Sequence, residues 1–578
     1  MTLITTLNSI LLSMFRKGIF SSIILISAFT AVSQNKLIVG LPVIEDYYRR
    51  SQLVENNDSS ASFLLRPIYL NSTESRGLYT PETKSDLLKP QVKFSSSKTP
   101  WFDFSFLPVQ INSQYTEKQP YGWNDGALIP ASGYQQTISA GFNTRVGPLS
   151  LQFYPTYQYA ENKSFEGIPL DQGSVLWARY YSYTLNSIDQ PERYGDGNYE
   201  KFLWGQSSIR LNAGPISLGL SNENLWWGPG RFNSLVMTNN ARGFKHLTIN
   251  SIKPIKSWLG SFEFQMIGGR LDESGFLPPG NNIVHNGRFI YRPKVNDWRY
   301  LSGIMFSYQP KWIPGLYLGA TRVVQQYHEN AKESKDYFGA VSNLWRKNDP
   351  GGIATEIQRD QLASAFLRFV WPEIQTEVYF EFGRNDAAQN FRDFFLEPWH
   401  SAAYNAGFRK LFPFQQKEDQ KIDASFEFTQ LQQSAGRIIR EAGTFYIHSR
   451  VRHGYTHNGE VLGAGIGPGS NLQTLEVNWV NELKKIGLTF ERYVHNNDYY
   501  FFAFNDIQDP RRHWVDISAF SNLSWDFGNL LINARLGVIK SLNYQYQIQD
   551  QIVPGAQYFV PGKDVINFKS SLDLIYRF

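Results

Sequence analysis

The sequence contains no cysteine among its 578 residues. This absence excludes disulfide bonds, thiolate metal sites and cysteine nucleophiles. Beyond its first 33 residues the chain also lacks any run of about 18 continuous apolar residues, so we expect no membrane-spanning helix in the mature protein. The chain also lacks a large excess of charge of either sign, with 56 Lys and Arg against 51 Asp and Glu. The formal net charge of +5 is too small to indicate nucleic acid or another strongly charged partner.

The first 33 residues predict a secretory signal peptide. Its charged region, apolar region and cleavage site are, in order, residues 16–17, 18–30 and 31–33. Cleavage would remove two positive and no negative residues and lower the net charge from +5 to +3. Met14 is an alternative start. A membrane anchor is the alternative role, although the apolar run is shorter than the ~20 residues that a helical span needs.

Aromatic side chains, by contrast, are abundant. The chain has 42 Phe, 32 Tyr and 15 Trp, yet its mean hydropathy is negative. This combination is unusual for a soluble enzyme. It is typical of a membrane barrel, whose strands alternate residues that face lipid with residues that face the lumen.

Apolar and polar residues alternate with a period of two through much of the chain. In one segment the apolar residues are Val378, Phe380 and Phe382, and the polar face carries Glu377, Tyr379 and Glu381. Segments 262–266, 424–429 and 532–536 repeat the pattern, which predicts strands with one apolar face. Periodicity alone fits a soluble sandwich or a membrane barrel. The signal peptide, the number of strands and the final strand favour the barrel.

The final segment, 567–578, predicts a strand that ends in phenylalanine. One of its faces carries Phe568, Leu572, Leu574, Tyr576 and Phe578. A closing strand of this kind resembles the signal by which the insertion machinery recognises outer-membrane barrels. At about 25 residues per strand, segment 97–578 has room for roughly 16 to 20 strands. We therefore predict an all-β fold, a large antiparallel transmembrane β-barrel of the outer membrane, in contact with outer-membrane lipid.

An N-terminal helix is predicted ahead of the barrel. Pro42 suits a first helical turn, and Ile44, Tyr47 and Tyr48 recur at helical spacing. Residues 70–98 are rich in polar residues and predict a linker. The expected domains are a signal peptide over 1–33, a periplasmic helical segment with linker over 34–96, and the transmembrane barrel over 97–578.

The most distinctive stretch is segment 222–243. Its notable residues are Trp226, Trp227, Gly228, Pro229 and Gly230, followed by Asn239, Asn240 and Arg242. An alternating strand over 216–220 precedes the segment, and another alternating run near 247–249 follows it. Proline fixes φ and glycine permits positive φ, so this part of the chain predicts a strand, a rigid turn and a second strand. Tryptophan pairs suit a boundary between membrane and water, where one end of the ring is apolar and the other is polar.

Segment 222–243 resembles the signature of Wzi-type capsule assembly proteins, in the form found in Bacteroidetes-like sequences. Segments 46–50, 62–67, 121–130, 379–404 and 454–471 carry the same resemblance, which covers most of the mature chain. It implies an outer-membrane barrel of 18 strands with periplasmic helices. Such a barrel would bind capsular or exopolysaccharide like a lectin and attach it to the cell surface. It would be a monomer with no enzymatic activity, no cofactor and no nucleic-acid partner.

Four polar segments predict long extracellular loops, namely 171–201, 278–296, 327–360 and 385–403, with a short helix over 332–346. Sugar recognition needs aromatic rings for C–H faces and polar groups for hydroxyls. The candidate glycan-binding residues are Trp345, Asp386, Trp399, His400, Tyr404, Tyr499 and Tyr500. For each ring the alternative is a place in the aromatic girdle at the membrane boundary.

Two other functions stay open at this point. A barrel of this size also fits a porin or a glycan-uptake channel. Asp386, His400 and Ser401 suggest a barrel enzyme of the Ser-His-Asp type, but a triad is defined by geometry and the chain has no Gly-x-Ser-x-Gly elbow. The simpler interpretation of these three residues is a hydrogen-bond network of loop and lumen.

The glycine-rich segment 454–471 has neither the strand-to-helix setting nor the Lys-Ser/Thr pair of a phosphate loop. It predicts a bent strand or close backbone packing inside the barrel. His448, His453 and His457 are spaced by five and four residues. A strand with this spacing does not bring all three together, so no metal site is predicted.

Overall fold

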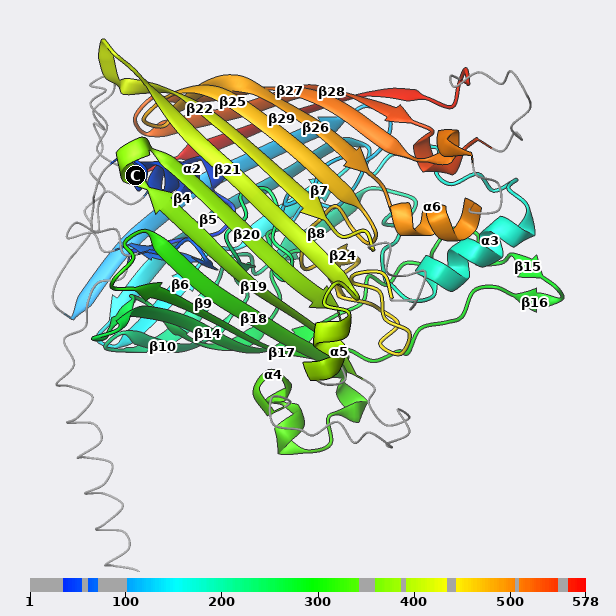
Figure 1. Cartoon of the computed structure of the whole chain (residues 1–578), viewed down its shortest axis with the longest axis horizontal. Coiled ribbons are helices and arrows are strands. Elements are labelled where there is room, and N and C mark those ends of the chain that lie inside the picture. The colour runs from blue at the N-terminus through cyan, green and yellow to red at the C-terminus, as the bar shows by residue number, and fades with distance from the viewer. Residues whose placement is uncertain are drawn as a thin grey trace, which may run out of the picture.

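The structure is a computed structural model. It describes residues 35–54, 61–70, 79, 101–342, 359–385, 391–433, 443–504, 509–548 and 560–578. Within these residues the chain forms a closed barrel of 18 antiparallel strands (Figure 1). The predicted fold class and strand number are confirmed. The predicted signal peptide, Met14 and nearly all of the predicted linker lie outside the described residues.

The wall strands are, in chain order, β4 (Phe102–Thr116), β5 (Gly133–Val146), β6 (Leu149–Phe153) with β7 (Thr156–Ala160), β8 (Tyr199–Leu203) with β9 (Ser208–Ala213), β10 (Ile216–Ser221), β12 (His246–Ser251) with β13 (Ile255–Lys256), β14 (Gly260–Leu271), β17 (Arg299–Pro310), β18 (Leu316–Tyr327), β19 (Arg359–Trp371), β20 (Thr376–Asn385), β21 (Ala402–Phe414), β22 (Lys417–Gln430), β25 (Asn471–Asn481), β26 (Lys484–Val494), β27 (Val515–Asp526), β28 (Leu530–Leu542) and β29 (Val565–Tyr576). Each pair joined by "with" is one interrupted strand, since both members of β6–β7 pair with β5. Strand β29 pairs with β4 and closes the barrel.

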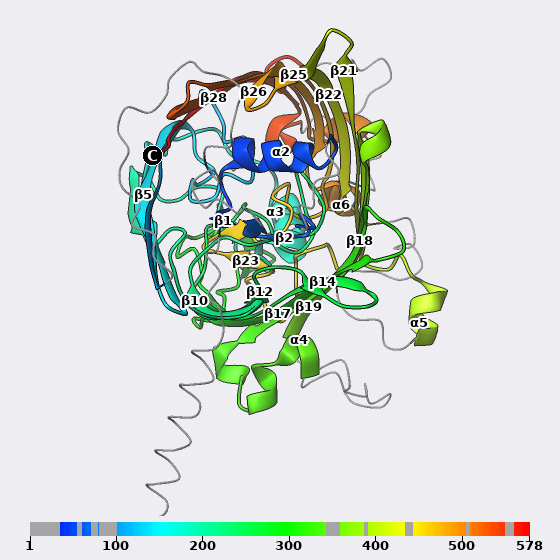
Figure 2. The same ribbon diagram turned by 90° about the vertical axis from the view of Figure 1, so that its left-hand side faces the viewer.

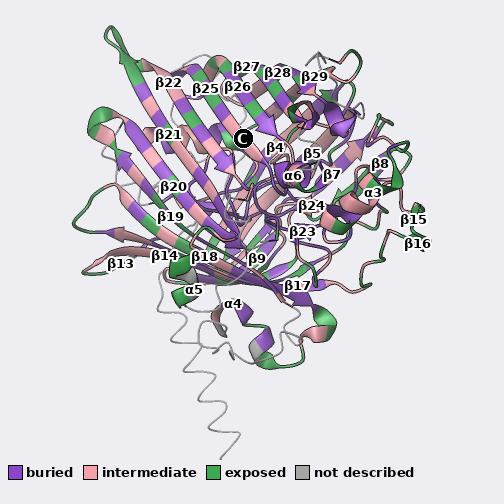
Figure 3. Cartoon of the chain, turned by 45° about the vertical axis from the view of Figure 1, so that its right-hand side comes forward, coloured by how far each residue is buried: buried purple, intermediate pink, exposed green. Residues whose placement is uncertain are grey.

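The wall turns its apolar face outward and its polar face inward. Leu218 and Leu220 are 45% and 60% exposed on the outside, whereas the adjacent Ser217 is buried. On β20, Phe380 faces out while Glu377 and Glu381 are fully buried inside. Figure 3 shows this alternation along neighbouring strands. A soluble barrel would have the opposite arrangement, so the predicted orientation of the strand faces is confirmed.

Helices in the described part of the chain are short. None of them is long and apolar enough to cross a membrane.

The two ends of the barrel differ in their connections. Tight turns such as 482–483 and 527–529 lie at one end, here called the short-turn end, together with the C-terminus (Figure 1). The described parts of all four predicted loops lie at the opposite end, here called the long-loop end. By the general rule for bacterial barrels, the long-loop end faces the outside of the cell.

The elements between wall strands are α3 (Ser174–Tyr180), η1 (Tyr181–Leu185), β15 (Val284–His285), β16 (Arg288–Phe289), η2 (His328–Asn330), η3 (Ser334–Asp336), α4 (Gly339–Ser342), η4 (Pro372–Ile374), α5 (Phe391–Leu396), β23 (Thr456–His457), β24 (Glu460–Val461), α6 (Asn497–Phe504), η6 (Pro510–Arg512) and η7 (Tyr544–Tyr546). The single helix predicted over 332–346 is wrong for its described part, which forms the short pieces η3 and α4.

The predicted strands on either side of segment 222–243 are confirmed as β10 and β12, which pair with each other. Segment 222–245 between them is much longer than the predicted tight turn. It leaves β10 at the long-loop end, folds into the lumen and returns to β12. Its one ladder, β11 (Trp226–Trp227), pairs with β2 (Leu65–Arg66) from the N-terminal segment. The turn chemistry was identified correctly, but the partner strand lies far away in the sequence and was missed.

The N-terminal segment closes the short-turn end. It consists of β1 (Asn35–Leu37), the helix α2 (Pro42–Ser51), β2, and β3 (Ile68–Leu70), which pairs with β1. The helix predicted over 41–50 is confirmed, with proline in its first turn. Figure 2 shows α2 lying across the mouth of the barrel. Arg50 donates a hydrogen bond of 2.7 Å to the carbonyl of Glu482 in a wall turn, which fixes the helix there.

Candidate functional site

Four segments fill much of the lumen, namely 35–54, 61–70, 222–245 and 443–470, and we call them together the plug. Some apolar side chains from each of the four segments join one cluster with inward-facing residues of the wall. The plug contributes Leu64, Trp227, Leu235 and Tyr446, and the wall contributes Leu301, Met305, Val323, Leu362 and Phe366. Burial of apolar area at this scale, at ~25 cal/mol per Å², makes the plug a packed core rather than a loose insert.

The two signature tryptophans lie inside the barrel, not at the membrane boundary as predicted. Trp227 is fully buried, and its indole N–H donates a hydrogen bond of 2.8 Å to Oε1 of Gln265 on β14. The guanidinium of Arg66 lies 5.0 Å from the ring centroid of Trp226. An inward-facing wall residue and an N-terminal arginine thus supply the polar partners that lipid headgroups would supply at a boundary.

The turn after the tryptophans needs its glycines. Gly228 has φ +118°, as predicted for a glycine beside proline. Its N–H donates to the carbonyl of Leu64 at 2.8 Å, and its carbonyl accepts from Arg66 at 3.2 Å. Gly230 has no positive φ, but a Cβ there would collide with the carbonyl oxygen of Asn233. The first glycine sets the chain direction and the second permits close approach.

Wall carboxylates hold the segment that follows the turn. The carboxylate of Glu427 on β22 accepts the backbone N–H groups of Arg231, Phe232 and Asn233 at 2.8, 3.1 and 2.7 Å. The hydroxyl of Tyr379 donates to the same carboxylate at 2.7 Å. Three successive N–H groups that converge on one anion form a nest, so the wall binds the plug backbone directly.

A second carboxylate joins helix α2 to the same turn. Glu377 on β20 accepts from Nε of Arg49 at 3.0 Å and from Nε of Arg368 at 2.8 Å. Arg49 also donates to the carbonyl of Pro229 at 2.7 Å. All three charged groups are fully or almost fully buried, so each depends on the others for its charge compensation.

Asp46 on α2 lies among cations. Arg409 and Arg231 approach its carboxylate at 2.8 and 3.2 Å. Burial opposes ionisation, yet Arg409, Arg50 and Arg231 hold the pKa of Asp46 well below its usual value. The helix therefore carries a fixed negative charge that matches the cations of wall and plug.

The remaining signature residues join segment 222–245 to another plug segment and to neighbouring parts of the chain. Asn240 donates to the carbonyl of Val461 at 2.9 Å, and Asn239 donates to that of Asn124 at 3.0 Å. Arg242 donates to the hydroxyl of Tyr199 at 3.3 Å. These side chains connect segments that are far apart in the sequence, which is a structural task.

The glycine-rich segment packs inside the barrel, as predicted. A Cβ at Gly463 would collide with the carbonyl of Leu235, and one at Gly465 would collide with Asn240 and Trp123. Side chains would force these strands of the plug apart.

The three histidines have separate partners. His453 Nδ1 lies 3.0 Å from the hydroxyl of Tyr327, and His457 Nδ1 accepts the N–H of Asp272 at 3.1 Å. His448 accepts the N–H of Val451 at 2.9 Å. The described residues contain no group of three His, Asp or Glu side chains that could hold a metal ion.

The predicted glycan-binding residues do not form one site. Tyr499 and Tyr500 are 1% and 7% exposed and offer no free ring face. Tyr404 lies on β21 on the outer face of the wall, with its ring 5.5 Å from that of Phe382, which is a girdle position. Trp399 is 59% exposed and His400 is half-buried, both before β21. Trp345 and Asp386 lie outside the described residues.

The long-loop end carries an aromatic surface that sequence reasoning did not find. Helices α3 and α6 lie side by side there (Figure 1), with the rings of Tyr180 and Tyr499 at 4.8 Å. Tyr183 stacks on Phe502 at 4.6 Å, and Phe502 is 41% exposed. We call α3, η1 and α6 together the aromatic cap. The run of four aromatic residues within 497–504, between two polar stretches, was the available signal.

Comparison with known proteins identifies the family. The family model described as capsule assembly protein Wzi matches residues 114–537. The chain belongs to the Wzi capsule assembly family. Among curated proteins, no sequence matches this Wzi-family chain.

Solved structures share the fold. The Wzi structure from Escherichia coli is titled an outer-membrane protein involved in group 1 capsule assembly and a carbohydrate-binding β-barrel. It is 13% identical, with a TM-score of 0.51 over 81% of this chain and 85% of that one. OccAB2 of Acinetobacter baumannii is 12% identical over 82% and 98% of the chains, with a TM-score of 0.39. OpdQ of Pseudomonas aeruginosa is 8% identical over 82% and 97%, with a TM-score of 0.37. The last two likenesses are too weak to carry an argument.

As a member of the Wzi family, the protein is an outer-membrane protein. Most of the segments whose sequences resemble the family meet inside this barrel. Residues 46–50, 62–67, 121–130, 226–243 and 454–471 contact one another in and around the plug. The wall carboxylates of 377–381 bind the same plug.

Proposed function

We propose that this Wzi-family barrel binds capsular or exopolysaccharide at its long-loop end and thereby attaches the polymer to the cell surface. The observation that carries the proposal is the aromatic cap, because it places the exposed ring of Phe502 and the half-buried ring of Tyr183 at the end that faces outward. The Escherichia coli relative, which is titled carbohydrate-binding, supports the same ligand class.

The mechanism is multivalent. Stacked rings such as Tyr183 and Phe502 offer a flat apolar surface to the C–H face of a pyranose. Each such contact is weak, but a polymer repeats the same sugar unit many times. Many weak contacts on one chain therefore sum to stable attachment through avidity.

Some of the predicted residues remain part of the proposal. Trp399 and His400 lie at an exposed edge of the long-loop end, and Trp345 and Asp386 stay predictions. Tyr404 serves the wall, and Tyr499 with Tyr500 supports the cap from within. We propose no catalytic step. The barrel acts as a monomer whose outer apolar face contacts lipid and is inserted by the outer-membrane insertion machinery.

Removing the two stacked rings of the cap tests the proposal. We expect the double variant Tyr183→Ala, Phe502→Ala to bind purified polymer roughly tenfold more weakly, because aromatic contacts contribute about 0.5–1.5 kcal/mol each. The measurement is retention of labelled polymer by cells that express equal amounts of barrel. Trp258→Ala is the matched control, since Trp258 is 78% exposed but lies in a turn at the short-turn end. Equal retention by the cap variant and the wild type would remove the cap from the mechanism.

A further inference from the structure

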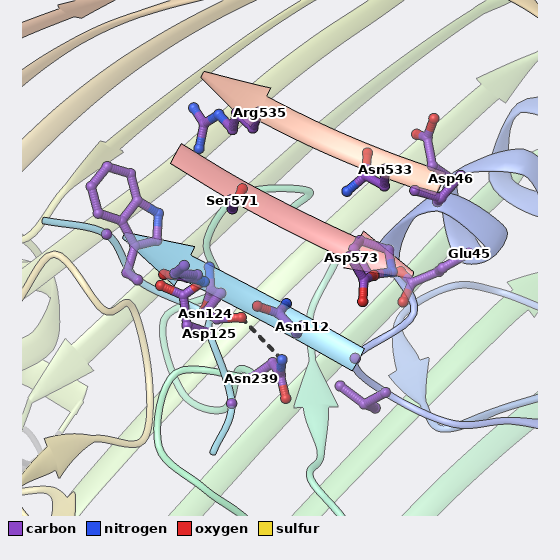
Figure 4. A pocket seen from close by; sticks show the side chains of 18 of the residues that line it. Glu45, Asp46, Asn112, Asn124, Asp125, Asn239, Asn533, Arg535, Ser571 and Asp573 are labelled. Atoms are coloured by element: carbon purple, nitrogen blue, oxygen red, sulfur yellow. Dashed lines mark hydrogen bonds between the residues drawn. The ribbon is translucent and has the colours of Figure 1, made fainter. Parts of the chain in front are cut away.

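A polar cavity of about 400 Å³ lies inside the barrel, between the plug and one side of the wall (Figure 4). Glu45 and Asp46 of α2 border it toward the short-turn end, and Asn124 and Asp125 border it on the opposite side. Its volume falls within the range of roughly 300–1,000 Å³ typical of small-molecule sites. The cavity is therefore large enough for a ligand.

Strand register arranges the wall of this cavity in two polar rows. The first row is Asn112, Asp573 and Asn533, and the second is Gln114, Ser571 and Arg535, on β4, β29 and β28 in each case. Figure 4 shows side chains from both rows on these three strands. Neighbours in a row are about 4.8 Å apart, and the rows are about 7 Å apart. This grid has the dimensions over which a sugar ring spreads its hydroxyl groups.

Several polar atoms of the grid have no protein partner. Asp573 accepts from Nε2 of Gln110 at 3.1 Å through one oxygen, and Asn533 accepts from the hydroxyl of Ser524 at 2.8 Å. Within the described residues, no hydrogen bond is found for the second oxygen of Asp573 or for the amide N–H₂ of Asn533. In the same described residues, the buried side-chain oxygen of Asn112 has no hydrogen-bond partner. Donors and acceptors placed together suit a polyhydroxylated ligand.

The charges around the cavity favour an uncharged ligand. The cations pair with carboxylates, as Lys485–Glu476 at 3.1 Å, Arg535–Glu491 at 2.8 Å, Lys569–Asp125 at 3.4 Å and Arg231–Asp46 at 3.2 Å. Asp573 has no ion-pair partner in the described part of the chain. An anionic ligand would compete with these acids for every cation, so a uronate or a phosphate is disfavoured.

One side of the cavity is aromatic. Tyr121 and Trp123 line it, with ring centroids 5.7 Å apart, and Phe520 stacks at 6.0 Å from Tyr121. The hydroxyl of Tyr121 donates to Glu491 at 2.9 Å, which fixes the ring. These rings offer an apolar surface for a C–H face, while the polar grid offers partners for hydroxyls.

We propose that this lumenal cavity binds one or two uncharged hexopyranose units, with hydroxyls on the grid of β4, β29 and β28 and a ring face toward Trp123. The proposal rests on the proposed function only for the source of the ligand, a unit of the bound polysaccharide. The cavity's own chemistry selects neutral sugars over acidic ones.

The test is calorimetric titration of the purified full-length barrel with free sugars. The detergent must have no sugar headgroup. The probes are D-glucose, D-galactose and N-acetyl-D-glucosamine, with D-glucuronate as the anionic comparator. We expect at least one neutral sugar to bind with Kd near ~1 mM, and glucuronate to bind at least about tenfold more weakly.

Two variants locate the binding. Asp573→Asn keeps the shape but replaces one side-chain oxygen by an N–H₂ donor, so we expect about tenfold weaker binding of the neutral sugar. Asp196→Asn is the matched control, because the side chain of Asp196 is fully exposed in a loop. Heat-dependent gel migration confirms that each variant is folded. If Asp573→Asn fails to fold, Trp123→Phe replaces it, with weaker binding expected from the smaller ring.

Three results would overturn the cavity proposal: no heat from any neutral sugar, unchanged binding in the folded variant, or preference for glucuronate. Polymer retention by cells distinguishes this failure from failure of the proposed function. Free sugars that do not bind, with retention intact, reject the cavity alone. Retention that does not depend on the barrel rejects the proposed function, whatever the sugars do.

Discussion

Purified protein in a planar lipid bilayer is expected to show no stable single-channel steps. The lumen is crossed by α2 at the short-turn end and by segments 222–245 and 443–470 from the long-loop end. Apolar side chains from plug and wall interlock around Trp227, and wall carboxylates bind the plug backbone. Ions would need a continuous water-filled pathway through the lumen, and this packing interrupts it.

A porin of similar size, reconstituted at the same protein-to-lipid ratio, is the positive control for the bilayer. Its open channel should give repeated steps under the same voltage. Frequent, long-lived steps from the Wzi-family barrel would contradict the filled lumen and favour the alternative of a porin or an uptake channel. Rare, brief events are expected from defects of the lipid bilayer itself and appear equally in protein-free bilayers.

The Glu377→Ala variant is expected to lower the stability of the plugged barrel by about 3–5 kcal/mol. Glu377 neutralises Arg49 of α2 and Arg368 of the wall, and all three are fully or almost fully buried. Without the carboxylate, two guanidinium groups remain in the lumen without their counter-charge. Urea titration, followed by tryptophan fluorescence and by heat-dependent gel migration, measures the free energy of unfolding.

Glu373→Ala provides the control, since Glu373 is exposed in the neighbouring turn of the same strand pair. Replacement of Glu377, Arg49 and Arg368 together by methionine is expected to recover most of the loss, because apolar residues of similar volume tolerate burial. If Glu377→Ala unfolds at the same urea concentration as Glu373→Ala, the buried ion pairs do not hold the plug.

Local rules predicted the wall well. A period of two places Glu377 and Glu381 on one face and Phe380 on the other. It does not tell which of the two faces points out of the barrel. The signal peptide, the number of strands and the final strand predicted an outward apolar face, and in the structure both acids point inward. Helix α2 could be predicted equally well, because proline at its start and apolar residues at helical spacing are local signals.

The packing inside the barrel could not be predicted, because it depends on contacts between residues far apart in the sequence. A Trp pair has the same composition at a membrane boundary and in a core, and only Gln265, some 38 positions onward, shows that Trp227 is inside. Glu427 receives three N–H groups from residues almost two hundred positions earlier. Tyr499 and Tyr500 were singled out for their chemistry, but packing against Tyr180 and His513 buries them. Such pairings depend on tertiary contacts that no local pattern encodes.

The signature thus marks the plug, and the polymer-binding surface is proposed on the loops above it. In this account the packed lumen gives the cap a rigid base, since α3 and α6 rest on connections that continue into the wall and the plug. Attachment then requires the barrel itself and requires no transport through its lumen.

The central claim is that the barrel keeps polysaccharide on the cell. Its most direct test is the partition of extracellular polysaccharide between cells and medium, in the wild type and in a strain that lacks this gene. We predict unchanged total polymer with a shift from the cell fraction to the medium, reversed when the intact barrel is restored. Polymer that stays cell-bound in the deletion strain, together with reduced solute uptake, would contradict the account.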